Sequence, residues 1–417
     1  MLALVDVNNF YVSCERVFKP SLNNKPVIVL SNNDGCIISR SNEAKAITGI
    51  KMGIPYFEIK NIVKKHNIQT FSSNYTLYAD LSNRTMSILR EFAIRQEIYS
   101  IDESFLDLTG ITSLTLHGQK IKATIKKWVG LPVGIGIAET KVLAKFANYL
   151  AKKYRGFDGV CNLDDLGKTR VDKAMQLTPI DEVWGIGRKI SYKLKLMGIK
   201  TIFDLKNANP KHLRNMFNIN IEKIINELNG IPCIALEDYH ELQQRIVSSR
   251  SFGAGIKSYD ALLSSLTHHV EQASKKLRKQ GLYTRQLTVF INTNRFKDDC
   301  YWHSKRIILP QAVDSFRYLA HYLEDSLKEL YVPGLTYKKS GIMLSDLITS
   351  EHEYIDLFDT INIRKDPIIG TLELIKRKFG KTAIDLAASK LNTSWNMRQD
   401  NLSPRYTTDI NELLTIS

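Results

Sequence analysis

Cysteines are few in this sequence and show no pairing pattern. Five are scattered over 417 residues, without a CxxC pair or a neighbouring histidine cluster, at Cys14, Cys36, Cys161, Cys233 and Cys300. An odd, widely spaced set argues against a disulfide framework and has no zinc-site spacing. The pattern is typical of a protein from a reducing compartment.

Long apolar runs are also absent. The N-terminal run, Leu2-Ala3-Leu4-Val5, stops at Asp6 and is too short for the apolar part of a signal peptide. No later run approaches the roughly 20 apolar residues that a membrane-spanning helix needs. We therefore expect a cytoplasmic protein that does not associate with membranes.

Acidic residues are outnumbered, with 43 Asp and Glu against 58 Lys and Arg, so the net charge is +15. The excess is +6 over residues 1–165, +3 over 166–241, +7 over 242–347 and −1 over 348–417. A basic surface on 166–347 favours a polyanionic ligand such as nucleic acid, although solubility alone also explains net charge. The chain length predicts two to four domains.

Three carboxylates lie beside strand-like stretches. Residues 98–101 and 105–108 predict paired strands with Asp102 and Glu103 at the turn, and Asp6 ends the N-terminal run. An acidic pair in a turn is by itself ordinary turn chemistry. A carboxylate that closes a buried strand is costly unless it is paired or metal-bound. If the N-terminal strand pairs with this hairpin, the three carboxylates converge and favour Mg²⁺.

The rest of the N-terminal half predicts alternating strands and helices. A hairpin turn at Asp34-Gly35 joins two strands, and glycines in a later strand would let another backbone or a ligand come close. The lysines of the helix after that strand fit a solvated face or phosphate contact equally well. The predicted strands are 25–30, 36–39 and 131–138, and the predicted helices are 42–47, 76–95, 119–129 and 140–153.

Residues 166–235 favour short helices. In this region Gly185 and Gly187 lead into a helix whose first turn carries Arg188 and Lys189. Such a turn lets backbone N–H groups contact a phosphate at a helix N-terminus. A plain helix–helix turn is the alternative, and the flanking basic residues favour the phosphate interpretation.

After a polar linker at 237–244, residues 245–347 predict a compact β-α-β-β-α-β unit. The predicted strands are 245–252, 284–292, 305–309 and 339–347, and the predicted helices are 262–280 and 316–330. Basic residues on these strands could face a sugar-phosphate backbone: Arg245, Arg250, Arg285, Lys305 and Arg306. Residues 348–417 predict one helix, at 370–378, and a remainder that a partner would order.

Seven motifs together resemble those of the Y-family, lesion-bypass DNA polymerases, of the UmuC type that supplies the catalytic subunit of bacterial DNA polymerase V. The resemblance covers most of the chain, and the motifs are specific only jointly. They are Asp6-Val7-Asn8-Asn9-Phe10-Tyr11, Ser31-Asn32-Asn33-Asp34-Gly35-Cys36, Phe71-Ser72-Ser73-Asn74-Tyr75, Tyr99-Ser100-Ile101-Asp102-Glu103, Gly134-Ile135-Gly136-Ile137-Ala138, Val183-Trp184-Gly185-Ile186-Gly187 and Ser249-Arg250-Ser251-Phe252-Gly253.

The resemblance implies an α+β, right-hand polymerase. Its parts would be a palm (1–11 and 76–165), small fingers (12–75), a helical thumb with a helix-hairpin-helix (166–236), a linker (237–244), a little finger (245–347) and a C-terminal partner-binding tail (348–417). The implied reaction is error-prone, template-directed transfer of deoxynucleotides from dNTPs to a primer 3′-hydroxyl opposite damaged template, in the SOS response.

The resemblance also implies site residues. Asp6, Asp102 and Glu103, with the backbone of Val7, would hold two Mg²⁺ ions. Tyr11 would be the steric gate that rejects a 2′-hydroxyl. The other implied nucleotide contacts are Asn8, Asn9, Phe10, Ser39, Lys45 and Lys152. Many family members have Tyr and Arg where this chain has Asn42 and Lys45, so a point charge replaces a bidentate fork and Asn42 is the weaker candidate.

Partners follow from the same resemblance. They are primer-template DNA, a cleaved UmuD dimer, a RecA filament and the sliding clamp. The clamp would bind the motif Tyr354-Ile355-Asp356-Leu357-Phe358, in which Tyr354 replaces the usual glutamine. Contacts to DNA would come from Gly185, Gly187, Arg188, Lys189, Arg245, Arg250, Arg285 and Arg306. Two alternatives are a non-catalytic DNA-binding scaffold and a nucleotide cyclase, and a cyclase has no use for the basic C-terminal half.

Overall fold

The structure is a computed structural model that describes residues 1–237, 243–294, 300–349, 367–380, 383–384, 387 and 395–413. The chain forms two compact units, Met1–Tyr239 with Asp400–Ser417, and His240–Gln399. Within the described residues, no helix is both long enough and apolar enough to cross a bilayer.

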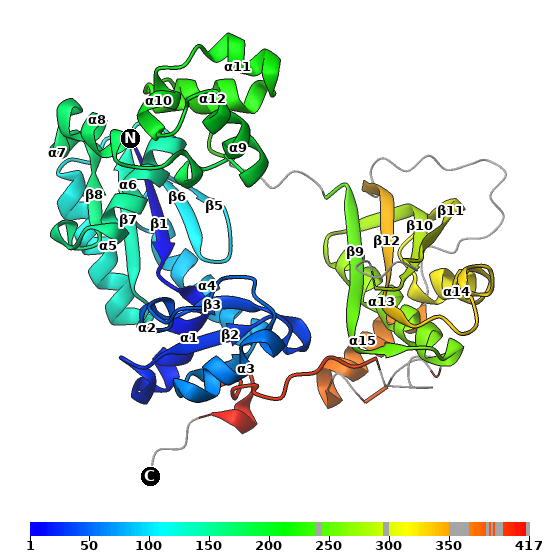
Figure 1. Ribbon diagram of the computed structural model, residues 1–417. Helices are drawn as coiled ribbons and strands as arrows, with labels where there is room; N and C mark the ends of the chain where they lie inside the picture. The colour runs from blue at the N-terminus through cyan, green and yellow to red at the C-terminus, as the bar shows by residue number, and fades with distance from the viewer. Residues whose placement is uncertain are drawn as a thin grey trace. The chain divides into compact units, whose positions relative to one another are not determined.

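The centre of the first unit is a five-stranded sheet in the order β5-β6-β1-β7-β8 (Figure 1). The strands are β1 (Leu2–Val7), β5 (Arg95–Ile98), β6 (Glu103–Asp107), β7 (Val133–Ala138) and β8 (Val160–Asn162). Strand β1 runs antiparallel to both β6 and β7, so the predicted pairing of the N-terminal strand with the acidic hairpin is confirmed. The hairpin boundaries differ from the prediction, because residues 95–98 form the first strand and Glu103 begins the second.

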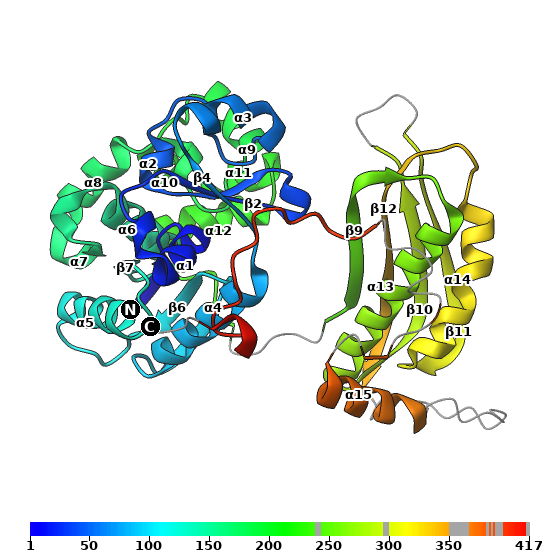
Figure 2. The same cartoon turned by 90° about the horizontal axis from the view of Figure 1, so that it is seen from below.

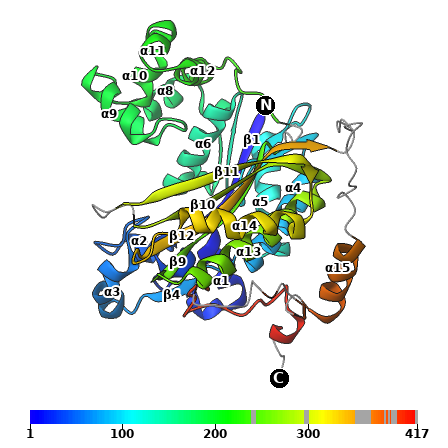
Figure 3. The same ribbon diagram turned by 90° about the vertical axis from the view of Figure 1, so that its right-hand side faces the viewer.

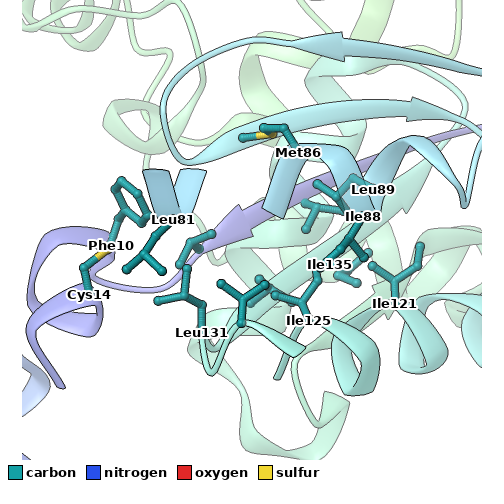
Figure 4. Close-up of a cluster of buried hydrophobic side chains, with 14 of the residues drawn as sticks. Phe10, Cys14, Leu81, Met86, Ile88, Leu89, Ile121, Ile125, Leu131 and Ile135 are labelled. Carbon is teal, nitrogen blue, oxygen red and sulfur yellow. The ribbon is translucent and has the colours of Figure 1, made fainter. Parts of the chain in front are cut away.

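Helices cover both faces of this sheet. On one face α1 (Phe10–Phe18), α4 (Tyr75–Arg90) and α5 (Leu114–Trp128) enclose the core in Figure 4, which includes Phe10, Leu81 and Ile135. On the other face α6 (Lys141–Lys153) packs against Leu4 and Phe105. Because successive residues of a strand face opposite sides, Asp6 and Glu103 lie on the α6 face.

A glycine sets the distance between α6 and the sheet. A Cβ atom on Gly136 would lie 2.1 Å from the Asn148 backbone nitrogen and 2.3 Å from the Ala144 carbonyl oxygen. Only a residue without a side chain leaves room for this backbone contact. The predicted close approach at the glycines of β7 is therefore confirmed, and another backbone makes it.

The remaining elements of the first unit are a small sheet and a helical region. The sheet, in the order β3-β2-β4, contains β2 (Val27–Leu30), β3 (Ile37–Arg40) and β4 (Gln69–Ser72), and the predicted turn joins β2 to β3. Helices α2 (Asn42–Lys45) and α3 (Tyr56–Lys65) accompany it. The predicted short helices follow: α7 (Leu163–Leu166), α8 (Lys168–Gln176), α9 (Arg188–Leu196), α10 (Ile202–Lys206), α11 (Pro210–Met216) and α12 (Ile219–Leu228).

The second unit has the predicted β-α-β-β-α-β order. Its elements are β9 (Arg245–Ile256), α13 (Tyr259–Lys279), β10 (Leu282–Asn292), β11 (Trp302–Val313), α14 (Phe316–Leu330) and β12 (Tyr337–Thr349). The strands form an antiparallel sheet in the order β11-β10-β12-β9, and α13 and α14 lie along it (Figure 2). Leucines of both helices fill the core with Leu287, Val289 and Ile291 of β10.

The C-terminal region contributes to both units. Helix α15 (Pro367–Phe379) belongs to the second unit, and Trp395 is buried there with its Nε1 donating to Ser264 Oγ at 3.1 Å. Residues 400–413 return to the first unit, where they run past α1 and β4 (Figure 3). The prediction that a partner orders everything outside the helix is therefore wrong for this segment, because its contacts are with its own chain.

Candidate active site

Two adjacent strands bring the predicted carboxylates together. Asp6 of β1 and Glu103 of β6 are direct cross-strand partners, and the backbone N–H of Val7 donates to the Asp102 carbonyl at 2.9 Å. The Ser100 hydroxyl donates to Asp102 Oδ1 at 2.6 Å and fixes the turn. The backbone thus places all three carboxylates at one end of the same strand pair, as predicted.

Lysines of α6 face these carboxylates. Lys152 Nζ lies 2.6 Å from Asp6 Oδ1, and Lys145 Nζ lies 2.9 Å from both carboxylate oxygens of Glu103. Lys141, on the same helix, is buried against Glu97. Lys152 and Lys153 are both exposed, and Lys153 contacts Tyr149. A solvated lysine face is therefore wrong for Lys141 and Lys145, and the exposed Lys152 is paired with Asp6.

Burial and neighbouring charges together set the ionisation of Asp6. The pKa of Asp6 is raised to about 6, chiefly by burial, with Lys152 opposing the shift and the Glu103 and Asp102 charges adding smaller contributions to it. Two acidic neighbours disfavour ionisation of the third carboxyl group, whereas a cation favours it. A further cation beside Asp6 would therefore favour its charged form.

The donor set fits a hard divalent cation, although the side chains are turned toward lysines. In the part of the chain that the structure describes, no three Asp, Glu, His or Cys side chains are arranged to hold a metal ion. Asp6 and Glu103 are instead paired with Lys152 and Lys145. Three carboxylates on adjacent strands match the oxygen ligands that Mg²⁺ prefers.

A polar cluster lies beside α1. Lys45 Nζ donates to Asn9 Oδ1 at 2.6 Å, and the Asn9 amide donates to Asn42 Oδ1 at 3.2 Å. Burial lowers the pKa of Lys45, and the nearby positive charges of Arg40 and Lys152 lower it further. The structure therefore gathers three cations, of which sequence reasoning missed Arg40. Asn42, the weaker candidate, lies within this cluster.

Other predicted nucleotide contacts have structural partners. The buried Ser39 hydroxyl accepts from the Val12 backbone N–H at 3.4 Å, and the Asn8 carbonyl accepts from the Ser13 hydroxyl at 2.6 Å. Phe10 belongs to the core of the first unit. Asn9 takes a left-handed conformation, with φ of 48°, at the start of α1, and its side chain does not cap that helix.

The half-buried Tyr11 lies in a cluster of aromatic rings. Its ring stacks on that of Tyr78, with centroids 4.8 Å apart and planes at 29°, and meets the Tyr75 ring edge-on at 6.0 Å. Tyr75 and Tyr78 both belong to α4, so this helix forms the platform beneath Tyr11. The sequence carried no local signal for the platform, because α4 is some sixty residues from Tyr11.

An aromatic contact also joins the short-helix region to the acidic hairpin. Trp184 Nε1 donates to the Tyr99 hydroxyl at 3.1 Å, and Lys145 Nζ lies 4.5 Å from the Tyr99 ring centroid. Beyond Trp184, Gly185 has φ of 91° and Gly187 begins α9 without a side-chain cap. Arg188 and Lys189 are exposed there, as the phosphate-binding interpretation requires.

The basic residues of the second unit divide between two faces of its sheet. Arg245 shares a cross-strand row with Ser345 and Gln286, and Arg306 pairs with Thr288, on the face away from the helices. Lys305 faces α14, where it pairs with Glu329. The guanidinium carbon of Arg250 is 5.6 Å from the centroid of the Trp395 ring, which contacts α13. Arg250 and Lys305 therefore differ from the prediction of an outward-facing row.

Two predicted features remain to be placed. Arg285 lies at an irregularity in the pairing of β10 with β11. The clamp motif, Tyr354 to Phe358, lies outside the described residues.

Comparison with known proteins decides the family. The pattern of the impB/mucB/samB family matches residues 5–149, and that of its C-terminal domain matches residues 243–357. The sequence is 41% identical to protein UmuC of Salmonella typhimurium over the full length of both chains. The chain belongs to the impB/mucB/samB family. A third pattern, a domain of unknown function, matches residues 366–416.

More distant relatives of this impB/mucB/samB protein agree. It is 28% identical to DNA polymerase IV 1 of Bacillus subtilis, over 92% of each chain. A Y-family DNA polymerase chimera of Dbh and Dpo4 covers 84% of this chain and 99% of its own, with a TM-score of 0.67 and 22% identity. The predicted right-hand polymerase fold is confirmed by this likeness. The predicted enzyme class, a DNA-directed DNA polymerase, is confirmed by family membership.

Proposed function

We propose that this protein performs error-prone translesion DNA synthesis in the SOS response, by transferring deoxynucleotides from dNTPs to a primer 3′-hydroxyl opposite damaged template. Family membership supports DNA and nucleotide binding and a divalent metal. The observation that carries the proposal is the cross-strand pair Asp6 and Glu103 beside Asp102, with a lysine opposite each member of the pair.

Each charged group then has a role. Asp6, Asp102 and Glu103, with the Val7 backbone, would hold two Mg²⁺ ions. When bound, Mg²⁺ would stabilise charge on the attacking and departing oxygens of the transfer. Lys152, once released from Asp6, would bind the triphosphate together with the Lys45 and Arg40 cluster. Tyr11 would pack against the deoxyribose and exclude a 2′-hydroxyl.

The remaining surfaces would bind nucleic acid and partners. Exposed Arg188 and Lys189 beside Gly185 and Gly187 would contact the DNA backbone, as would Arg245 and Arg306. Fingers of about sixty residues (12–75) leave little surface for testing base-pair shape, which fits low fidelity. We extend the proposal to a cleaved UmuD dimer, a RecA filament, the sliding clamp and a cytoplasmic location, on the resemblance alone.

Primer extension on an abasic-site template, with Mg²⁺ and all four dNTPs, tests this function. Wild type is compared with Asp102→Asn and Glu103→Gln, each with and without cleaved UmuD and RecA filament. Asp107→Asn is the matched control, because Asp107 lies on the same strand and pairs with Arg95 at 3.0 Å. We expect bypass by wild type and the control, and none by the other two variants.

Two results would contradict the proposal. Bypass that survives in Asp102→Asn and Glu103→Gln would move the chemistry away from these strands. Wild type and variants that are all inert, yet bind primer-template equally tightly, would favour the scaffold alternative.

A further inference from the structure

The segment formed by residues 400–406 contacts two sequence motifs to which the proposed reaction gives no task. Its Asp400 backbone N–H donates to Asp34 Oδ2 at 2.9 Å, in the Asn-Asp-Gly turn. Asn401 exchanges hydrogen bonds with Ser72, at 2.9 and 3.0 Å. These contacts fasten the segment to the small three-stranded sheet of the first unit.

Asn74 links this segment to the helix beneath Tyr11. Its amide nitrogen donates to the Ser403 carbonyl at 3.1 Å, to the Ser403 hydroxyl at 3.1 Å and to the Pro404 carbonyl at 3.2 Å. Its Oδ1 accepts from the Leu77 backbone N–H and thereby caps α4, which carries Tyr75 and Tyr78. One buried side chain therefore holds the C-terminal segment and the start of that helix together.

Ser403 also holds a buried carboxylate. Its hydroxyl donates to Glu15 Oε1 at 3.0 Å, and the Tyr78 hydroxyl donates to the same oxygen at 2.6 Å. Glu15 is 1% exposed, and Ser403 is 6% exposed. A buried carboxylate needs such donors, since desolvation penalises its charge. Loss of the Ser403 hydroxyl would leave Glu15, and with it Tyr78, less firmly placed.

This series of contacts ends at the Tyr11 ring, which the proposed function uses to select the sugar. Tyr78 is fully buried and held at its hydroxyl by Glu15, and Tyr11 stacks on its ring at 4.8 Å. A steric gate works only if its ring cannot yield to the extra oxygen of a ribonucleotide. The platform beneath Tyr11 therefore determines how strictly the gate excludes it.

We propose that residues 400–406 are a positioning element for nucleotide selection. Ser403 fixes Glu15 and Asn74, and these two residues fix Tyr78 and the start of α4. Tyr78 then holds the Tyr11 ring rigid against a 2′-hydroxyl. This inference rests on the proposed function of Tyr11. It assigns a task to part of the region that matches a domain of unknown function, residues 366–416.

The test is single-nucleotide insertion by the full chain, with each dNTP and the matching rNTP opposite an undamaged template base. The readout is the ratio of kcat/KM for the deoxynucleotide to that for the ribonucleotide. We expect Ser403→Ala and Tyr78→Phe each to lower this ratio about five-fold, the order of one lost hydrogen bond, with dNTP insertion itself nearly unchanged. Ser403→Thr keeps the hydroxyl and should keep the ratio.

Further variants separate the possible failures. Tyr11→Ala is expected to lower the ratio most, and Tyr406→Phe, which keeps the ring that stacks on Phe18 at 4.7 Å, should be neutral. A ratio that falls in Tyr11→Ala but not in Ser403→Ala or Tyr78→Phe would overturn the inference and leave the gate standing. A ratio that Tyr11→Ala does not change would overturn the gate, and the inference with it.

Two additional measurements distinguish positioning of the gate from a purely structural role. Equal losses of dNTP and rNTP insertion in Ser403→Ala, with a lower melting temperature, would mean a structural role only and overturn the inference. The double variant Ser403→Ala with Tyr78→Phe should lower the ratio no further than either single variant, because both act through Glu15. If wild type inserts no nucleotide, hydrogen exchange of the amides of residues 75–81 is compared between Ser403→Ala and Ser403→Thr. Faster exchange in Ser403→Ala would support the coupling of Ser403 to α4, and equal exchange would overturn it.

Discussion

The charged side chains proposed to act on a ligand face the helices in one large sheet and face away from the helices in the other. In the five-stranded sheet of the first unit, Asp6 and Glu103 face α6, where lysines pair with them. In the four-stranded sheet of the second unit, Arg245 and Arg306 face away from the helices. An inward charge is costly unless it is paired, whereas an outward charge is not. The first arrangement suits chemistry on a bound group, and the second suits contact with a polyanion.

The largest effect is expected where an inward charge loses its partner. Lys141 is 2% exposed and pairs with Glu97 of β5. Lys141→Met would leave that carboxylate buried without its cation and lower the free energy of unfolding by about 3–5 kcal/mol. Urea unfolding followed by hydrogen exchange in the first unit measures it. The control is Lys122→Met, which removes an outer pair with Asp158 and should cost less than about 1 kcal/mol. Equal losses would contradict the comparison.

The next effect concerns catalysis. Lys152 pairs with Asp6, whereas its neighbour Lys153 contacts Tyr149. We expect Lys152→Ala to lower kcat/KM for dNTP insertion about 100-fold, since a charge-assisted contact to phosphate is lost. Lys153→Ala should remain within about two-fold of wild type. Steady-state insertion kinetics check both variants, and a Lys153 effect as large as that of Lys152 would refute the assignment.

An uncharged group buried in the second unit gives a pH dependence. Burial lowers the pKa of His269 from 6.5 to about 3, with the positive charges of His268, Arg250 and Lys339 acting in the same direction. Between pH 3 and 6.5 the unfolded state therefore binds more protons than the folded state. The stability that neutral His269 contributes is complete above pH 6.5 and is lost as the pH falls toward 3. We expect a loss of about 2 kcal/mol between pH 6.5 and 4.5.

Hydrogen exchange of α13 amides at several pH values measures this loss. His269→Asn can still accept a hydrogen bond from the Ser248 hydroxyl, which lies 3.0 Å from the histidine Nδ1, and cannot titrate. The variant should show a smaller pH dependence in the second unit. An unchanged slope would assign the dependence to other groups.

The smallest effect is expected on the outward face. Arg306 and Lys305 are adjacent on β11 and point to opposite sides of the sheet. Arg306→Ala should weaken binding to primer-template DNA a few-fold and reduce the slope of log affinity against log salt by about one. Lys305→Ala should change neither quantity. Fluorescence anisotropy over a salt series measures both, and identical behaviour of the two variants would mean that the strand face does not matter.

Local signals explain what could be predicted. The Asp34-Gly35 turn, the N-terminal strand and the β-α-β-β-α-β order depend on residues close in sequence, and all three appear in the structure. Strand ends were less predictable. The helix was expected to run to Arg95 and the strand to begin at Ile98, whereas β5 spans Arg95–Ile98, because pairing with β6 prevails over helical propensity.

Side-chain direction was harder to predict. Helical spacing places Lys145 and Lys152 on one face of α6 but does not say which sheet covers it. Gly136 brings the helix so close to β7 that this face meets the carboxylates. Arg250 shows the same limit, since its strand position predicts a basic face and Trp395 lies against it.

The sequence by itself determined the element order, the family motifs and the adjacency of Asp102 and Glu103, because these depend on neighbours along the chain. Only the tertiary structure decided that lysines pair with Asp6 and Glu103, that Tyr78 supports Tyr11, and that Ser403 reaches Glu15 from 388 positions away. Contacts between such distant residues leave no local pattern, since the packing of the whole unit determines which side chains meet.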